Sequence, residues 1–386
     1  TRHRGTSDWR ADVAMGETGY EPRGGRTVID AGGTGTALGG SLMAAEVLQA
    51  MQSAAGAFVD MNERHTAAGR RIADLLGVEA CCVTCGAAAG LAIAAAACMT
   101  GTRRSYAYQL PDTTGMKDEI LCLKCHRDLY DQGMLLSGAH FVEVGVTSSA
   151  FLQQIEDRIT ERTAAFFYTS EAETMRGSIP LPEIAALCRA HGIPIIVDAA
   201  AELPPKANIR KYLDDGASLV VFSGGKEIRG PQASGMILGS RELIAACDLN
   251  CCPNYGIGRP MKVDKENICG LVKAVELFVQ RDYDQIMAQW DGYVDTIRAG
   301  LADCPGLEMT VGVPTEPGVQ PACIRRLFLR PLTMSAVELR LALIGGEPSI
   351  YTFLYQDQIV INPQCLQPHE LMPIVQAVRA ILTRQS

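Results

Sequence analysis

Phe222 to Gln232 read FSGGKEIRGPQ, one lysine behind two glycines, and an apolar run over 217–222 leads directly into them. The apolar run predicts a buried β-strand. Lys226 is therefore expected at a strand end, where glycines let other atoms come close. A desolvated lysine at such a place suits an amine that forms a Schiff base with a carbonyl compound near neutral pH. A surface turn with an ordinary lysine is the alternative.

Composition limits the classes of protein to which the chain can belong. Its 386 residues suffice for a large domain and a smaller one, and 47% hydrophobic with 20% charged residues is typical of a folded, soluble chain. The net charge is −8 without any block of basic residues, which argues against nucleic acid as the main partner because phosphate backbones need a clustered positive surface.

No apolar run is typical of a membrane span, since residues 83–99 are mostly Ala and Gly. The first residues lack the apolar core of a signal peptide, so we expect a cytoplasmic protein that does not bind membranes. The 14 cysteines form short pairs in apolar segments, away from any His at zinc-finger spacing. We therefore expect reduced thiols and no metal.

Strand and helix patterns alternate over residues 119–245, and the apolar runs are too hydrophobic for a sheet with one wet face. This alternation predicts an α/β fold with a mainly parallel sheet covered on both faces. Strands are expected at 80–84, 119–123, 141–144, 164–168, 194–197, 219–222 and 235–238. Helices are expected near 62–76, 127–137, 149–159 and 181–191.

Four regions follow along the chain: a polar arm over 1–27, a large domain over 28–255, an interdomain segment over 256–294, and a small α+β domain over 295–386. One long helix is expected to run through the interdomain segment to about Trp290. The glycine-rich residues 31–41 are expected to form a loop that either folds tightly or approaches a ligand. Ser41 is expected to cap a helix beginning near Met43.

Three marked residues fall at expected strand ends, the edge where such sheets bind ligands: His126, Asp198 and Lys226. Asp198 precedes Lys226 by 28 residues, about one helix and one strand, which predicts neighbouring parallel strands. Its carboxylate either caps a turn or holds a protonated pyridine nitrogen. His126 either stacks on a cofactor ring or is an ordinary polar histidine.

The turn Cys85-Gly86-Ala87-Ala88 joins an expected strand to an Ala-rich helix. Its uncovered backbone N–H groups lie at the positive end of the helix dipole, which suits a phosphate; close helix packing explains the alanines equally well. Ser223 can donate a hydroxyl to the same phosphate. An anion cradle, a stacking ring, a carboxylate and a lysine together describe a pocket for pyridoxal 5'-phosphate (PLP).

The order of these pieces resembles the fold-type I PLP-dependent enzymes, and the H…D…S-x-x-K spacing resembles their class V aminotransferase and cysteine desulfurase branch. Four segments are similar to the group that contains D-glucosaminate-6-phosphate ammonia-lyase and bacterial selenocysteine synthase: DAGGT with LGGS (30–34, 38–41), VDAAAELPP (197–205), SGGKEIRGPQ (223–232) and GRPMKV (258–263). The resemblance implies a mainly parallel seven-stranded sheet in the large domain and a homodimer or higher oligomer with pockets at the subunit interface.

The resemblance also implies roles for individual residues. Lys226 is the Schiff-base lysine, Asp198 the partner of the pyridine nitrogen and His126 the stacking residue. The phosphate site comprises Gly86, Ala87, Ala88 and Ser223. Two positions depart from the family's pattern, because Cys85 stands where Ser is usual and Glu202, expected beside the cofactor, stands where Gln is usual.

The expected reaction is an ammonia-lyase type α,β-elimination on a small polar amino acid or amino-sugar acid. Arg229, Arg259 and Lys262 are candidates for binding a substrate carboxylate or phosphate; structural ion pairs are the alternative. An aminotransferase, racemase or cysteine desulfurase-like enzyme remains open, as does a non-catalytic binding subunit with a PLP fold. Selenocysteine synthase activity is disfavoured, because a tRNA substrate needs a basic surface or an added domain.

Overall fold

The protein is described here by a computed structural model covering residues 25–314 and 320–384. The chain divides into two compact units. One comprises residues 34–289, 313–314 and 320–324, and the other comprises 25–33, 290–312 and 325–384. Most of the expected N-terminal arm, residues 1–24, lies outside the described residues. The domain limits expected from the sequence stay predictions.

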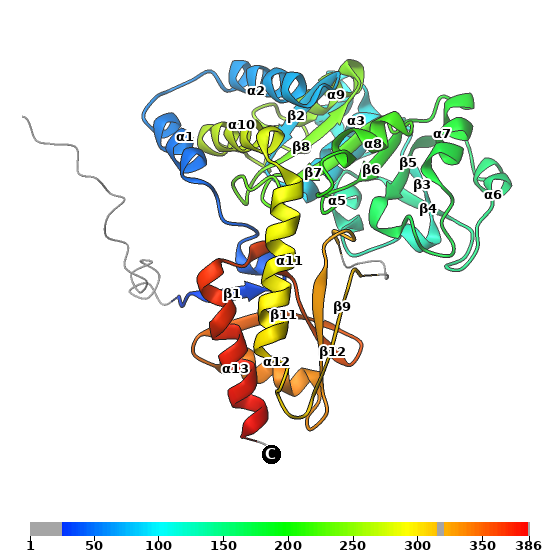
Figure 1. Cartoon of the computed structure of the whole chain (residues 1–386). Helices are drawn as coiled ribbons and strands as arrows, with labels where there is room; N and C mark the ends of the chain where they lie inside the picture. The colour runs from blue at the N-terminus through cyan, green and yellow to red at the C-terminus, as the bar shows by residue number, and fades with distance from the viewer. Residues whose placement is uncertain (1–24, 315–319, 385–386) are drawn as a thin grey trace, which may run out of the picture. The chain divides into compact units, whose positions relative to one another are not determined.

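The larger unit contains a seven-stranded sheet (Figure 1). Its strands are β2 (Ala80–Thr84), β3 (Glu119–Leu123), β4 (His140–Val144), β5 (Thr163–Thr169), β6 (Ile195–Asp198), β7 (Leu219–Ser223) and β8 (Gly235–Gly239). Its helices are α1 (Ala45–Ala55), α2 (Met61–Leu76), α3 (Ala87–Thr100), α4 (Arg104–Gln109), α5 (Asp131–Leu135), α6 (Leu152–Glu156), α7 (Leu181–Ala190), α8 (Asn208–Asp214), α9 (Arg241–Asn250) and α10 (Lys265–Gln280). Short 3₁₀ turns are η2 (Thr36–Leu38), η3 (Lys124–His126) and η4 (Ser170–Ala172).

The strand order is β2-β8-β7-β6-β5-β3-β4, and every neighbouring pair is parallel except the two pairs that β8 makes, with β2 and β7. The α/β fold with a mainly parallel seven-stranded sheet is therefore confirmed. β5, β6 and β7 are adjacent, with Thr169 beside Asp198 and Asp198 beside Val221. Their carboxyl ends consequently meet at one edge of the sheet.

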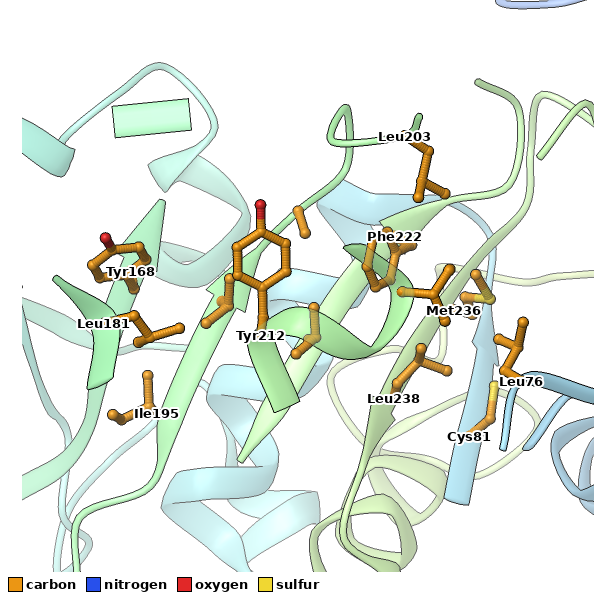
Figure 2. Packing of buried hydrophobic residues seen from close by; sticks show 14 of the residues in the cluster. Leu76, Cys81, Tyr168, Leu181, Ile195, Leu203, Tyr212, Phe222, Met236 and Leu238 are labelled. Atoms are coloured by element: carbon orange, nitrogen blue, oxygen red, sulfur yellow. The ribbon is translucent and has the colours of Figure 1, made fainter. Parts of the chain in front are cut away.

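Both faces of this sheet are buried. Along β6, Ile195 and Val197 pack on one face and Ile196 on the other, as the alternation of side chains along a strand requires. Figure 2 shows part of the first face, where Phe222 lies among side chains from neighbouring strands and helices. This double cover explains the continuous apolar runs in the sequence.

The smaller unit contains a five-stranded sheet of order β1-β11-β12-β10-β9. Its strands are β1 (Val28–Ala31), β9 (Leu307–Gly312), β10 (Arg326–Pro331), β11 (Ser349–Tyr355) and β12 (Gln358–Ile361). β1 pairs with β11 in parallel, and the other neighbours are antiparallel. The second half of α11 (Tyr283–Gly300), α12 (Ala336–Gly345) and α13 (Leu371–Thr383) bury their apolar faces on this unit's core, and two 3₁₀ turns, η5 (Pro363–Cys365) and η6 (Pro368–Glu370), precede α13.

Two local predictions are wrong. Ser41 does not cap a helix, because α1 begins at Ala45 after Ala44, and the Ser41 hydroxyl instead donates a 2.9 Å hydrogen bond to the Gly225 carbonyl. The single long helix is two helices, α10 and α11. They are separated at Arg281, whose backbone is extended, and Asp282, whose carboxylate accepts hydrogen bonds from the first N–H groups of α11.

No helix in the described part of the chain is long and apolar enough to cross a membrane. No disulfide bond joins any of the fourteen cysteines, all of which lie in the described residues. Among the described residues, no cluster of three or more His, Cys, Asp or Glu side chains is arranged to hold a metal ion.

Candidate active site

A cavity of about 270 Å³ lies in the larger unit, where β5, β6 and β7 end and α3 begins. It is lined by Thr36, Cys85, Gly86, Ala87, Ala88, Leu91, Asp128, Tyr130, Thr169, Ser170, Glu171, Asp198, Ala200, Ala201, Glu202, Ser223, Lys226 and Gln232. The cavity therefore lies at the edge of the sheet where the sequence predicts a ligand site. Most of the residues singled out in the sequence lie in this cavity.

Lys226 extends into the cavity from the turn that follows β7. The turn is held by hydrogen bonds from Gly224 N–H to the Ser234 carbonyl (2.9 Å) and from Gly230 N–H to the Gly224 carbonyl (2.8 Å). A Cβ atom on Gly225 would lie 2.7 Å from the Gln232 Cα atom, so the backbone itself needs a glycine there. Burial lowers the pKa of the Lys226 amine, and the charge of Asp198 is the largest opposing effect.

Asp198 is the last residue of β6 and is only 8% exposed. One carboxylate oxygen accepts a 2.9 Å hydrogen bond from the Ala200 N–H. Burial raises the pKa of Asp198, while the Ala200 hydrogen bond and the charge of Lys226 lower it. A cationic group in the cavity would therefore stabilise the charged form of the Asp198 carboxylate.

The start of α3 lines the cavity beside Ser223. Gly86 has φ +147°, and its carbonyl accepts a 2.9 Å hydrogen bond from the Thr84 hydroxyl. A Cβ atom on Gly235 of β8 would lie 2.7 Å from the Gly86 carbonyl carbon, so two glycines let β8 approach the turn. The first N–H groups of the 14-residue α3 have no partner within the helix and are available to an anion.

Glu202 also lines the cavity and is 9% exposed. Burial raises the pKa of its carboxyl group to about 7, and the Ser170 side chain opposes this shift. The backbone beside it is fixed, because the Asn208 amide donates a 2.7 Å hydrogen bond to the Glu202 carbonyl. Glu202, which stands where Gln is expected from the resemblance, is therefore close to the other acids that line the cavity.

The structure does not bring His126 to the cavity. Its ring is 1% exposed, and its two nitrogens lie 2.9 Å from the Ser178 hydroxyl and 3.0 Å from the Thr169 N–H. The Tyr168 ring packs against it edge-on at 4.4 Å between centroids. His126 does not line the cavity, and its role as a stacking residue stays a prediction. Burial lowers the pKa of His126 to about 4, so the ring is neutral.

The three cationic candidates for substrate binding also lie outside the cavity lining. The Arg229 guanidinium is 4.0 Å from the Glu227 carboxylate. Arg259 lies over the Tyr255 ring, 5.9 Å from its centroid. Lys262 is exposed and does not line the cavity. Their roles toward a substrate stay predictions.

Several cavity residues were not singled out in the sequence: Thr36, Asp128, Tyr130, Thr169, Ser170, Glu171 and Gln232. Glu171 and Asp128 each follow a strand end by a few residues, so the rule that selected Asp198 also applies to them. Thr36 belongs to the glycine-rich loop for which a ligand contact was one of two readings. Only their common cavity reveals them as a set.

The residues present fit PLP. The cavity offers a partly buried amine at Lys226, a buried carboxylate at Asp198 and an uncovered helix N-terminus at Ala87 and Ala88 beside the Ser223 hydroxyl. An amine, a carboxylate and a phosphate cradle match the aldehyde, the ring nitrogen and the phosphate of PLP. The fit rests on these groups in this chain alone.

Comparison with known proteins gives the same class. Residues 131–289 match the family model described as SelA, L-seryl-tRNA selenium transferase. The chain is 34% identical to a Streptomyces 5'-C-glycyluridine monooxygenase-decarboxylase (94% of this chain, 92% of the relative). It is 33% identical to D-glucosaminate-6-phosphate ammonia lyase of Salmonella typhimurium (94% and 97%). A solved structure of D-glucosaminate-6-phosphate ammonia-lyase superposes with a TM-score of 0.81 at 31% identity, over 95% of this chain and 98% of the other.

Fold, cavity and relatives define a fold-type I PLP-dependent enzyme. The chain belongs to the family that includes D-glucosaminate-6-phosphate ammonia-lyase and the bacterial selenium transferases. Its cofactor is therefore pyridoxal 5'-phosphate, and the expectation of a PLP enzyme drawn from the sequence is confirmed.

Proposed function

We propose that this enzyme is an ammonia-lyase that catalyses an α,β-elimination on a small polar amino acid or amino-sugar acid. The observation that carries the proposal is that Lys226 and Asp198, at the tips of neighbouring strands, line one cavity. When bound, PLP forms an imine with an amine and accepts electron density in its protonated ring.

The chain's own residues divide the remaining work. Lys226 holds the cofactor aldehyde and receives the α-proton, which its lowered pKa favours near neutral pH. Asp198 keeps the ring nitrogen protonated. Ser223 and the first N–H groups of α3 would bind the phosphate, and Glu202 lines the same cavity.

A second candidate is oxidative decarboxylation of an amino acid attached to a nucleoside. It is supported by a relative of 34% identity that is named a monooxygenase-decarboxylase. The relative named an ammonia lyase matches at almost the same identity, 33%, and has the more similar length, with 97% of it covered. Elimination remains the lead because a solved structure of the ammonia-lyase also superposes on 95% of this chain with a TM-score of 0.81.

The two functions differ in their products. Purified enzyme with PLP is to be incubated with L-serine, D-serine, D-glucosaminate, D-glucosaminate 6-phosphate and 5'-C-glycyluridine. Each reaction is run both in air and without oxygen. Elimination is expected to release ammonia and a keto acid at equal rates in both atmospheres. Carbon dioxide release that depends on oxygen uptake would support the second candidate. An amino product after addition of a keto acid would support an aminotransferase.

We further propose a homodimer or higher oligomer in which a second copy supplies cations to this cavity. Leu129 (92% exposed) directly precedes Tyr130 (59% exposed), which lines the cavity. Arg259 and Lys262 do not line the cavity of their own chain. A second copy would cover Leu129 and Tyr130, and its cations would offset the negative charge of the acids that line the cavity.

Sedimentation velocity tests the oligomer. We expect a dimer or a larger species at micromolar concentration, and mixing inactive Lys226→Ala with inactive Arg259→Ala protein is expected to restore part of the activity. A fully active monomer would refute this proposal.

A further inference from the structure

Glu171 lies in the 3₁₀ turn η4, directly after β5, and lines the cavity. Two hydrogen bonds fix the start of the turn. The Ser170 hydroxyl donates a 2.6 Å hydrogen bond to the Asp198 carbonyl, and the Thr169 hydroxyl donates one of 3.0 Å to the His126 carbonyl. The backbone that carries Glu171 is therefore held next to the tip of β6.

Four carboxylic acids line the cavity, and three of them have partners within the protein. Asp198 accepts a hydrogen bond from the Ala200 N–H (2.9 Å), and Asp128 accepts one from the Tyr130 N–H (2.7 Å). The Ser170 side chain forms a hydrogen bond with the Glu202 carboxyl group. The Glu171 carboxyl group has no such contact within residues 25–314 and 320–384. Its hydrogen-bonding capacity is thus directed to whatever occupies the cavity.

Burial and the charge of Asp128 shift Glu171 toward its protonated form. Burial raises the pKa of Glu171 from its ordinary value of 4.5, the charge of Asp128 raises it further, and that of Lys226 opposes both. Asp198 and Glu202 are also close, since the charge of Glu171 raises their pKa values in turn. A protonated carboxyl group can donate a hydrogen bond and then a proton.

The sheet order separates the two groups that can move protons. Lys226 follows β7 and Glu171 follows β5, with β6 and Asp198 between them. They therefore approach a substrate from two sides of the central strand. The amine can address the α-carbon while the acid addresses a substituent at the β-carbon.

We propose that Glu171 is the general acid that protonates the leaving hydroxyl at the β-carbon. The inference rests on the elimination proposed above. Lys226 takes the α-proton, the electron pair of that carbon–hydrogen bond forms a double bond between the α- and β-carbons, and the β-carbon–oxygen bond breaks with its electron pair remaining on oxygen. The Glu171 proton joins that oxygen, which leaves as water, and the Glu171 carboxylate regains a proton from solvent. Hydroxide is a poor leaving group, so this proton has a large effect on the rate.

The test uses a leaving group that needs no proton. Glu171→Gln keeps the shape and removes the acid, and Glu173→Gln makes the same change two residues away, where the glutamate pairs with Lys211 instead of lining the cavity. Wild type and both variants are assayed for ammonia release from serine, D-glucosaminate and β-chloroalanine. Exchange of the α-hydrogen in D₂O is followed by NMR.

We expect Glu171→Gln to lose about 10²-fold or more in kcat/KM with the hydroxyl-bearing substrates. Elimination from β-chloroalanine and α-hydrogen exchange should stay within about threefold of wild type, because chloride departs without a proton. Glu173→Gln should match wild type on all substrates. Glu171→Asp should restore part of the activity with hydroxyl-bearing substrates.

Equal losses on chloride and hydroxyl substrates, or no loss on either, would overturn the role of Glu171 while leaving the elimination intact. Wild type that exchanges the α-hydrogen but releases no ammonia from any hydroxyl-bearing substrate would overturn the proposed function and this role together.

In wild type, the rate with hydroxyl substrates relative to β-chloroalanine should fall as pH rises above 4.5 through the raised pKa of Glu171, because the acid form is lost. A ratio independent of pH would contradict the proposal.

Discussion

Lys226→Ala is expected to lower kcat/KM for ammonia release by about 10⁴-fold, because the change removes both the covalent attachment and the base for the α-proton. Exchange of the α-hydrogen should fall by a similar factor. Wild-type enzyme treated with borohydride should carry the reduced cofactor on the peptide that contains Lys226, as mass spectrometry would detect. The variant should carry none.

Lys273→Ala is the matched control, since it also removes one lysine. Its amine lies 2.6 Å from the Glu276 carboxylate on α10 and does not line the cavity. It should retain full activity and the borohydride label. Small added amines should restore part of the activity of Lys226→Ala, because the deleted side chain leaves space in the cavity. A label on another lysine would show that the assignment is wrong.

The sequence predicted the parts of the site that follow from strand ends. Lys226, Asp198 and Ser223 each stand at or just past an apolar run, and parallel strands end at the same edge, so their meeting in one cavity follows from topology alone. Gly86 and Ala87 follow from the strand-to-helix turn in the same way. These are statements about backbone position, which hydrophobic patterns encode well.

Side-chain direction is less accessible from sequence. His126 stands at a strand end like Asp198 but does not line the cavity, and its ring contacts Ser178, Thr169 and Tyr168. These partners lie 42 to 52 residues away, and no local pattern shows that they converge. Glu171 was missed for the same reason, since the absence of a hydrogen-bond partner for its carboxyl group among the described residues is a property of the assembled cavity.

Asp198→Ala gives the second large effect, an expected loss of about 10³-fold in kcat/KM. The aspartate holds the proton on the pyridine nitrogen, and without that charge the ring accepts electrons poorly. The buried carboxylate has a raised pKa in this cavity because burial penalises its charge. A cationic ring should therefore lower that pKa by pairing with it, so the variant should also bind PLP more weakly in a spectral titration.

A permanently charged cofactor separates this electrostatic role from a structural one. PLP methylated on its ring nitrogen carries the positive charge without needing a carboxylate, and Asp198→Ala leaves room for the methyl group. This cofactor should restore at least about tenfold of the lost activity to Asp198→Ala and none to Lys226→Ala. Asp214→Asn, an exposed change on α8, should behave as wild type. If the methylated cofactor gives Asp198→Ala no advantage over PLP, the charge of Asp198 does not act on the ring, and the orientation proposed for the cofactor is wrong.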